Sequence, residues 1–180
     1  MKKTLAFVLA ATMLVLLCAC GGSGNTDTTD PAKIKGEVID AGEVKALLPE
    51  GWMNVPATDV FNDNAAKTNE LKFYKGAKSD LDQLSCPYVQ IDYYGENHTS
   101  MDVKDLYDNV KDVEDVVAGS YTFTGYTGEM VEGYTNAILW LKDNPDIMQV
   151  TLNLTSTKNG VKSIELTDAD LIAILSSIEY

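Results

Sequence analysis

Side chains suited to catalysis are scarce in this sequence of 180 residues, which contains one histidine and three cysteines. A Ser-His-Asp triad needs histidine beside a nucleophile and an orienting acid, but no Gly-x-Ser-x-Gly elbow accompanies His98. A zinc site needs several His or Cys ligands. The sequence therefore predicts no enzyme, no metal site and no cofactor, and His98 is interpreted as a solvated loop residue.

Two groups of Asp and Asn residues offer the oxygen ligands that calcium prefers. One group consists of Asp59, Asn62, Asp63 and Asn64, and the other of Asp143, Asn144 and Asp146. Neither has the spacing of a calcium-binding loop, so turn formation is the preferred interpretation. A carboxylate pair for glycoside hydrolysis can arise by proximity in the fold. An envelope hydrolase with such a pair is therefore kept as an alternative.

The N-terminal segment has the pattern of a secretory signal. Lys2 and Lys3 precede an uncharged apolar run over residues 5–17. Such a run matches the central region of a signal peptide and is shorter than the roughly 20 residues of a membrane-spanning helix. We expect residues 1–19 to be a signal peptide that is removed.

The run ends in Leu17-Cys18-Ala19-Cys20, which resembles the lipobox of bacterial lipoproteins. In that family the lipobox cysteine receives a diacylglyceryl group, and the chain is cut just before it. The resemblance implies lipidation of Cys20, because small Ala19 would precede the cut. Cys18 fits less well, because bulky Leu17 would occupy that position. The implied location is the cell membrane, at its extracytoplasmic face.

Processing at this point changes the cysteine and charge balance. The net charge would go from −13 to −15 as the two signal lysines are lost. Cys86 would be the one unmodified cysteine, which excludes an intramolecular disulfide and is common in Gram-positive anaerobes. We interpret Cys86 as a small buried hydrophobe. An acidic chain without arginine is not expected to bind nucleic acid.

Composition divides the mature chain into a tether and one domain. Residues 20–33 combine the lipidated cysteine with a stretch rich in Gly, Ser, Thr and Asp, which is typical of a flexible linker. Residues 34–180 are long and apolar enough to form one domain with its own core.

Alternating apolar and polar residues predict an antiparallel sheet with one covered face and one solvated face. The expected strands cover residues 34–39, 43–48, 71–75, 88–94, 120–126, 129–132, 134–141 and 147–155. Tyr88 and Tyr94 fall on the polar face, as do Gln149 and Asn153 of the last strand. Aromatic rings mixed with amides suit sugar or protein recognition. These four residues are therefore the candidate interaction surface.

Two helices are expected to cover the apolar face. The first, over residues 101–112, would bury Val103, Leu106, Tyr107 and Val110 at helical spacing. The second, over residues 168–178, would bury Leu171, Ile174, Leu175 and Ile178, with Thr167 and Asp170 as a capping box. The fold class predicted from these elements is α+β, an antiparallel sheet with helices packed on one face.

The segment over residues 44–52 reads Val-Lys-Ala-Leu-Leu-Pro-Glu-Gly-Trp and resembles the opening of PsbP-like domains. The order of the later elements and the final Ile-Glu-Tyr are similar as well. The resemblance implies a PsbP-like sandwich over residues 43–180, a scaffold that binds other macromolecules. Only the Pro-Glu-Gly-Trp turn can be matched, so no functional residue is transferred. Trp52 is expected to anchor the core beside a tight turn at Gly51.

These observations predict a membrane-anchored lipoprotein whose domain is a non-catalytic binding module. Its expected partners are the membrane, through the lipid on Cys20, and an unidentified envelope protein or wall polymer. Besides the hydrolase, a second alternative is a small-ligand carrier, which would need a sizeable apolar pocket between sheet and helices.

Overall fold

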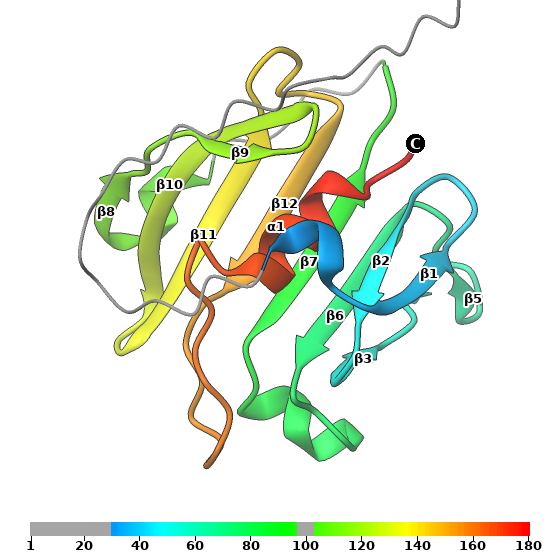
Figure 1. Ribbon diagram of the computed structural model, residues 1–180, viewed down its shortest axis with the longest axis horizontal. Helices are drawn as coiled ribbons and strands as arrows, with labels where there is room; N and C mark the ends of the chain where they lie inside the picture. Colours follow the sequence, from blue (N-terminus) through cyan, green and yellow to red (C-terminus); the bar gives the residue numbers. More distant parts are fainter. Residues whose placement is uncertain (1–29, 97–102) are drawn as a thin grey trace, which may run out of the picture.

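The structure, a computed structural model, describes residues 30–96 and 103–180. Its centre is an eight-stranded antiparallel sheet with the order β3-β6-β7-β12-β11-β10-β8, in which β9 also pairs with β10 (Figure 1). The strands are β3 (Trp52–Asn54), β6 (Glu70–Lys75), β7 (Tyr88–Tyr93), β8 (Asp108–Asp112), β9 (Val116–Ala118), β10 (Tyr121–Val131), β11 (Tyr134–Leu141) and β12 (Met148–Asn153).

Smaller elements surround this sheet. Two hairpins lie outside it: β1 (Gly36–Asp40) with β2 (Lys45–Pro49), and β4 (Thr58–Asp59) with β5 (Ala65–Ala66). The helical elements are three short 3₁₀ turns, η1 (Pro31–Lys33), η2 (Asp80–Leu84) and η3 (Lys104–Leu106), and the helix α1 (Ala169–Ser176). Helix α1 lies across one face of the sheet, with η1 and β2 beside it (Figure 1).

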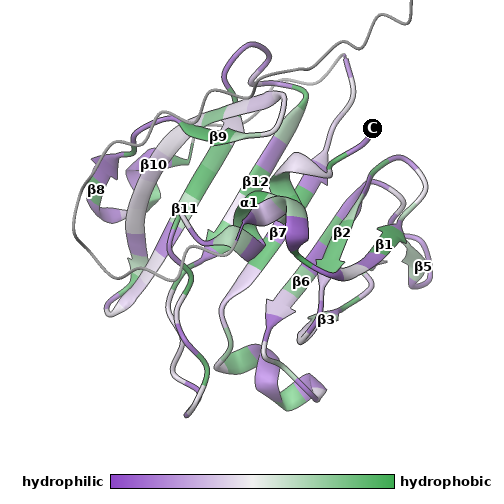
Figure 2. Ribbon diagram, in the orientation of Figure 1, coloured by the Kyte–Doolittle hydropathy of each residue, from purple (hydrophilic) through white to green (hydrophobic). Residues whose placement is uncertain are grey.

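Strict alternation explains why the central strands bury one face only. In β12 the residues Met148, Val150 and Leu152 are buried and their neighbours are half-buried. The strand register places apolar residues opposite apolar residues, since Val150 pairs with Ile91 and Leu152 with Val89 on β7. Figure 2 shows the same division, with green hydrophobic stretches on the central strands and purple along the edge strand β8. The predicted antiparallel sheet is confirmed.

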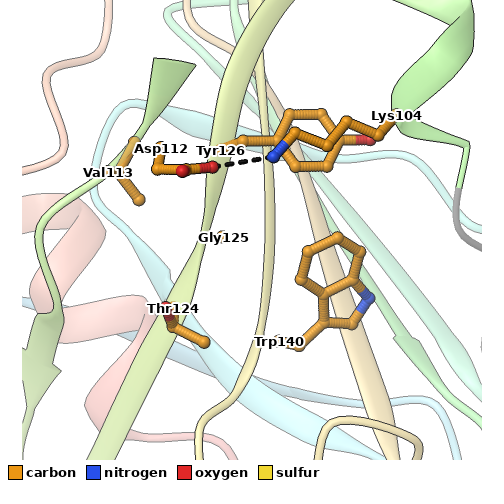
Figure 3. Close-up of a pocket in the computed structure, with 7 residues that line it drawn as sticks. All are labelled: Lys104, Asp112, Val113, Thr124, Gly125, Tyr126 and Trp140. Carbon is orange, nitrogen blue, oxygen red and sulfur yellow. Dashed lines mark hydrogen bonds and ion pairs between the residues drawn. The ribbon is translucent and has the colours of Figure 1, made fainter. Parts of the chain in front are cut away.

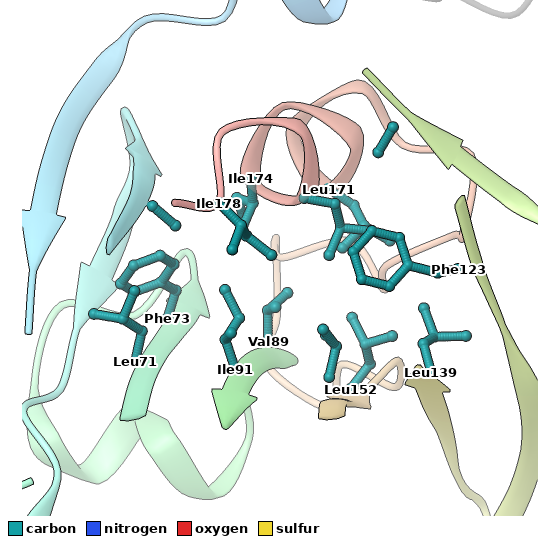
Figure 4. Close-up of a cluster of buried hydrophobic side chains, with 14 of the residues drawn as sticks. Leu71, Phe73, Val89, Ile91, Phe123, Leu139, Leu152, Leu171, Ile174 and Ile178 are labelled. Carbon is teal, nitrogen blue, oxygen red and sulfur yellow. The ribbon is translucent and has the colours of Figure 1, made fainter. Parts of the chain in front are cut away.

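The core fills the space between this buried face and α1. Figure 4 shows side chains of α1 directed toward those of the sheet, in contact across one continuous apolar cluster. The labelled residues are Leu71, Phe73, Val89, Ile91, Phe123, Leu139, Leu152, Leu171, Ile174 and Ile178. Strand β2 closes the cluster on one side with Ala46 and Leu48, together with Val44, which directly precedes the strand.

The C-terminal helix confirms its predicted buried stripe but not its predicted cap. Asp168 is the N-cap residue of α1. The Asp170 carboxylate instead accepts a hydrogen bond from the Trp52 indole at 3.2 Å. Trp52 is buried and follows Gly51, whose φ of 85° is the turn conformation that glycine permits. The predicted anchoring role of Trp52 is confirmed.

The expected helix over residues 101–112 is wrong. Residues 101 and 102 lie outside the described part of the chain, Lys104–Leu106 form one 3₁₀ turn, and Asp108–Asp112 form an edge strand on β10. Leu106, expected on the buried stripe, is 65% exposed. A local helix would leave one edge of β10 without these backbone partners, and pairing with β8 satisfies them.

The predicted fold class is therefore wrong as well. The described chain is mostly β, and its single α-helix has eight residues, so it is not an α+β sandwich of the PsbP-like kind with helices covering the sheet. The β1–β2 hairpin does part of the covering that a second helix was expected to do. Within the described residues, none of the helices has the length and apolarity needed to cross a membrane.

Candidate functional site

The face of the sheet opposite α1, here called the open face, carries polar and aromatic side chains in three rows. Cross-strand register defines each row. The first row contains Met53, Tyr74, Tyr88, Asn153 and Asn136. The second contains Lys72, Gln90, Thr151, Ile138, Tyr126 and Asp112, and the third contains Glu70, Asp92, Gln149, Trp140 and Thr124.

Aromatic rings lie at both ends of these rows. At one end the Tyr74 and Tyr88 rings are 5.3 Å apart, and the Lys72 ammonium lies 4.4 Å from the centre of the Tyr88 ring. At the other end the Tyr126 and Trp140 rings are 5.7 Å apart. Burial lowers the pKa of Lys72 and raises the pKa of Tyr74 to about 12. The rings therefore form two aromatic patches. Tyr107 lies near both, because its ring is 5.7 Å from the Tyr126 ring, and burial together with the Tyr107 phenol raises the pKa of Tyr88.

A chain of amide and hydroxyl groups extends from the Trp140 patch toward the middle of the face. The Trp140 indole donates a hydrogen bond to the Gln149 side-chain oxygen at 3.3 Å, and the Gln149 amide donates to the Thr151 hydroxyl at 3.1 Å. Each donor in this series of hydrogen bonds has its acceptor on the same face. The bonds fix the side-chain rotamers through neutral groups and not through ion pairs. The middle of the open face therefore presents oriented dipoles.

Two carboxylates lie directly opposite each other at one edge of this region. Glu70 and Asp92 are cross-strand partners. The Gln90 amide donates to both Asp92 oxygens at 3.1 Å, and the Lys67 ammonium pairs with Glu70 at 2.7 Å. Burial and the neighbouring Glu70 charge raise the pKa of Asp92 to about 6, against the opposing effect of the Gln90 hydrogen bond.

A hollow of about 420 Å³ lies at the other end of the open face. Its lining residues are Lys104, Asp112, Val113, Thr124, Gly125, Tyr126 and Trp140 (Figure 3). The Lys104 ammonium pairs with the Asp112 carboxylate at 2.8 Å and lies 5.4 Å from the centre of the Tyr126 ring. Gly125 is at the centre of the lining residues. A Cβ there would be 1.9 Å from the Ile138 carbonyl oxygen, so only glycine fits.

The structure brings the four predicted surface residues to one face. Tyr88 and Asn153 are direct cross-strand partners in the first row, and Gln149 lies in the third row. Tyr94 follows the end of β7, and burial together with the Asp92 charge raises its pKa to about 12. Asn153 has a local role too, because its side-chain oxygen accepts a hydrogen bond from the Thr155 backbone at 3.1 Å.

The hollow itself was missed by reasoning from sequence. Trp140 had a usable signal, because it alternates with buried Leu139 and Leu141 and pairs with Gln149 across the predicted hairpin. Lys104 and Asp112 had none, because the helical spacing of their neighbours assigned both to a helix. Their approach to β10 depends on a pairing between segments far apart in sequence.

The other candidate residues that the structure describes are not part of this face. Cys20 and His98 lie outside the described residues. Cys86 is fully buried, and burial raises the pKa of its thiol, which agrees with the predicted hydrophobic role. Asp59 caps a turn by accepting the Phe61 N–H at 2.8 Å, and Asp63 and Asn64 have the positive φ values of turn residues. Among the described residues, no group of three or more His, Cys, Asp or Glu side chains is placed to hold a metal.

Comparison of the chain with family models, with curated proteins and with solved structures finds no match.

Proposed function

We propose that this protein is a lipid-anchored, non-catalytic binding module of the cell envelope, and that its open face binds an uncharged glycan. The observation that carries the proposal is the half-buried part of the open face, where the side chains of Gln90, Gln149, Thr151 and Trp140 lie together. Tyr74, Tyr126 and Ile138 of the same face are buried. Sheet faces that serve only as packing surfaces are apolar and covered, as the opposite face is. A half-buried polar face with fixed rotamers suits recognition of a polar polymer.

The charge distribution favours an uncharged partner. The chain has a net charge of −13, but two carboxylates of the open face are paired with lysines, and a third, Asp92, lies near Lys67 and Lys72. Glu70 pairs with Lys67 and Asp112 with Lys104. A cationic polymer would be attracted by unpaired carboxylates, whereas this face offers dipoles, which are complementary to hydroxyl and amide groups.

The lipobox supports the location. The eleven residues from Cys20 to Asp30, the first described residue, would span about 15–20 Å if they behave as a flexible chain. A lipid on Cys20 would hold the domain beside the membrane, within reach of envelope polymers. The acidic body would be repelled by anionic lipid headgroups, so the acyl chains would have to supply the attachment.

Photo-crosslinking in native membranes tests this proposal. A photoreactive phenylalanine at position 88 replaces Tyr88 on the open face, and a matched one at position 176 replaces Ser176, which is exposed on α1. We expect glycan to be attached at position 88 and not at position 176. If a single protein is crosslinked at position 88, the partner of the open face is a protein and the glycan proposal is wrong. Equal labelling at both positions would also overturn the proposal.

One observation favours a second function, the envelope hydrolase. Glu70 and Asp92 face each other across two strands, and the pKa of Asp92 is raised to about 6, as is typical of a general acid. Full-length protein incubated with neutral oligosaccharides distinguishes the two functions. If the oligosaccharides are hydrolysed and Glu70→Gln abolishes the hydrolysis, the protein is a hydrolase. If the oligosaccharides remain unchanged, the hydrolase is excluded and the binding module is favoured.

The small-ligand carrier has no comparable support. The space between the sheet and α1 is filled by core side chains, and Phe73, Leu152 and Ile174 are fully buried there.

A further inference from the structure

The hollow on the open face differs from the rest of that face in shape and chemistry. Its volume of about 420 Å³ falls within the range of about 300–1,000 Å³ typical of small-molecule sites. Two aromatic rings, one hydroxyl and one ion pair line it. A single sugar ring is complementary to such a lining, because it has an apolar face of C–H groups and hydroxyl groups that donate and accept hydrogen bonds.

The Trp140 ring has a fixed orientation and offers a flat contact surface. Its indole N–H is engaged by Gln149, and its ring contacts Tyr126 at an interplanar angle of 54°. An indole that is fixed in this way loses little rotamer entropy when a ligand binds. Sugar rings expose C–H groups on one face, and such apolar faces stack on aromatic rings.

The opposite side of the hollow supplies hydrogen bonds. Thr124 is the cross-strand partner of Trp140 and contributes a hydroxyl. The Asp112 side chain is 82% exposed although it pairs with Lys104. A carboxylate has about four lone-pair sites, so Asp112 can accept from a sugar hydroxyl while the ion pair persists. In Figure 3, Asp112 and Trp140 lie on opposite sides of Gly125.

We infer that the hollow is a subsite for one saccharide ring, with Trp140 as the stacking surface and Thr124 and Asp112 as hydroxyl contacts. The inference rests on the proposed function, since it names the part of the open face that determines which glycan is bound. The ion pair makes the subsite selective for uncharged sugars, because an acidic sugar would compete with Asp112 for Lys104 and bring a second carboxylate near the first.

The two tryptophans of the chain give a direct readout. Trp52 is 8% exposed in the core, so Trp52→Phe leaves Trp140 as the sole tryptophan, and Trp140→Phe leaves the buried Trp52 as the matched control; excitation that selects tryptophan avoids the signal of the nine tyrosines. Full-length protein in detergent is titrated with the neutral tetramers of glucose and of N-acetylglucosamine. We expect a saturable fluorescence change in Trp52→Phe for at least one tetramer and no change in Trp140→Phe.

Calorimetry with the same tetramers measures the contribution of the ring. Trp140→Ala is expected to weaken binding about tenfold or more, and Trp140→Phe by about threefold or less, because phenylalanine keeps a stacking ring. Ser176→Ala on α1 is the control, and equal thermal unfolding of all variants excludes a folding defect.

Two results would overturn the subsite. Tetramer binding that Trp140→Ala leaves unchanged would place the glycan elsewhere on the domain, while the proposed function would stand. Absence of saturable binding up to about 10 mM would exclude a saccharide in the hollow. In that case, glycan crosslinked at position 88 would still support the proposed function, and a lack of crosslinked glycan would remove both.

Discussion

At the scale of single residues, Asp92 shows how the open face combines burial with charge. The groups that face it are Glu70, Lys67, Lys72 and Tyr94, and the Gln90 amide binds both of its oxygens. Burial is the largest effect on its pKa and favours the protonated form. Ionised Asp92 is therefore a cost to the folded state at neutral pH.

Replacement of Asp92 by Asn should stabilise the protein at neutral pH. The pKa of this carboxyl rises from 3.8 to about 6 on folding, so the folded state binds the extra proton between these values. Stability is lost as the pH rises through that window and stays low above it. Asp92→Asn should therefore gain about 1–2 kcal/mol at pH 7 and nothing below pH 3.8, as about two pKa units allow.

Urea denaturation of both proteins between pH 3.5 and 7.5 measures this difference. Asp112→Asn is the control, because that carboxylate is exposed and paired with Lys104, so no comparable gain is expected. A loss of stability in Asp92→Asn at pH 7 would mean that the hydrogen bonds from Gln90 outweigh the burial of the charge.

At the scale of elements, β8 shows why a helical pattern became a strand. Two residues of β8, at positions 109 and 110, oppose one residue of β10, Gly128, and this bulge needs the positive φ of Asn109, 55°. Tyr107 packs edge-on against Tyr126 at 5.7 Å. A Cβ at position 128 would be 2.8 Å from the Tyr107 Cβ, so glycine is needed for that approach.

Substitutions at Asn109 test the bulge. Valine disfavours a positive φ, so Asn109→Val should lower the free energy of unfolding by about 1–2 kcal/mol. Asn109→Gly should remain within about 0.5 kcal/mol of the original protein, because glycine adopts this conformation readily. Equilibrium unfolding in urea measures both, and an equal loss in the two variants would contradict the bulge.

Helix α1 is the second element whose packing can be tested. Leu171 is fully buried against the sheet, whereas Ser176 is exposed on the same helix. Leu171→Ala should cost about 2–5 kcal/mol through lost apolar contact and the cavity left behind. Ser176→Ala should change stability by less than about 0.5 kcal/mol. A small effect of Leu171→Ala in urea unfolding would show that α1 contributes little to the core.

At the scale of the whole molecule, the two ends of the described chain meet on the covered face. Lys45 and Glu179 exchange two backbone hydrogen bonds of 2.9 Å, and the Leu47 N–H donates to the Ser177 hydroxyl at 2.8 Å. The C-terminal segment thus fastens β2 over the core. All of this lies on the side of the sheet away from the open face.

Membrane attachment is expected to depend on one cysteine. Cys20→Ala should release the protein from the membrane fraction, because the acidic domain has no other expected anchor. Cys18→Ala is the matched control and should stay membrane-bound. Fractionation of cells that express each variant measures this, and unchanged association of Cys20→Ala would contradict the lipobox prediction.

The sequence by itself determined the elements whose signals are local. Alternation over residues 88–94 and 147–155 predicted β7 and β12 and their polar face, and the apolar stripe around Leu171 predicted α1. These patterns hold because side-chain direction in a strand or helix follows from the backbone repeat. The resemblance of residues 17–20 to a lipobox is equally local, and lipidation of Cys20 stays a prediction.

Only the tertiary structure decided the segment around β8 and the hollow beside it. The spacing of Val103, Tyr107 and Val110 suits a helix locally, but the edge of β10 offers backbone hydrogen bonds to Asp108–Asp112. The choice between helix and strand depends on contacts with a segment far away in the sequence, so no local pattern predicts it. The hollow between Asp112 and Trp140 exists because Asp108–Asp112 pair with β10 as a strand instead of forming a helix.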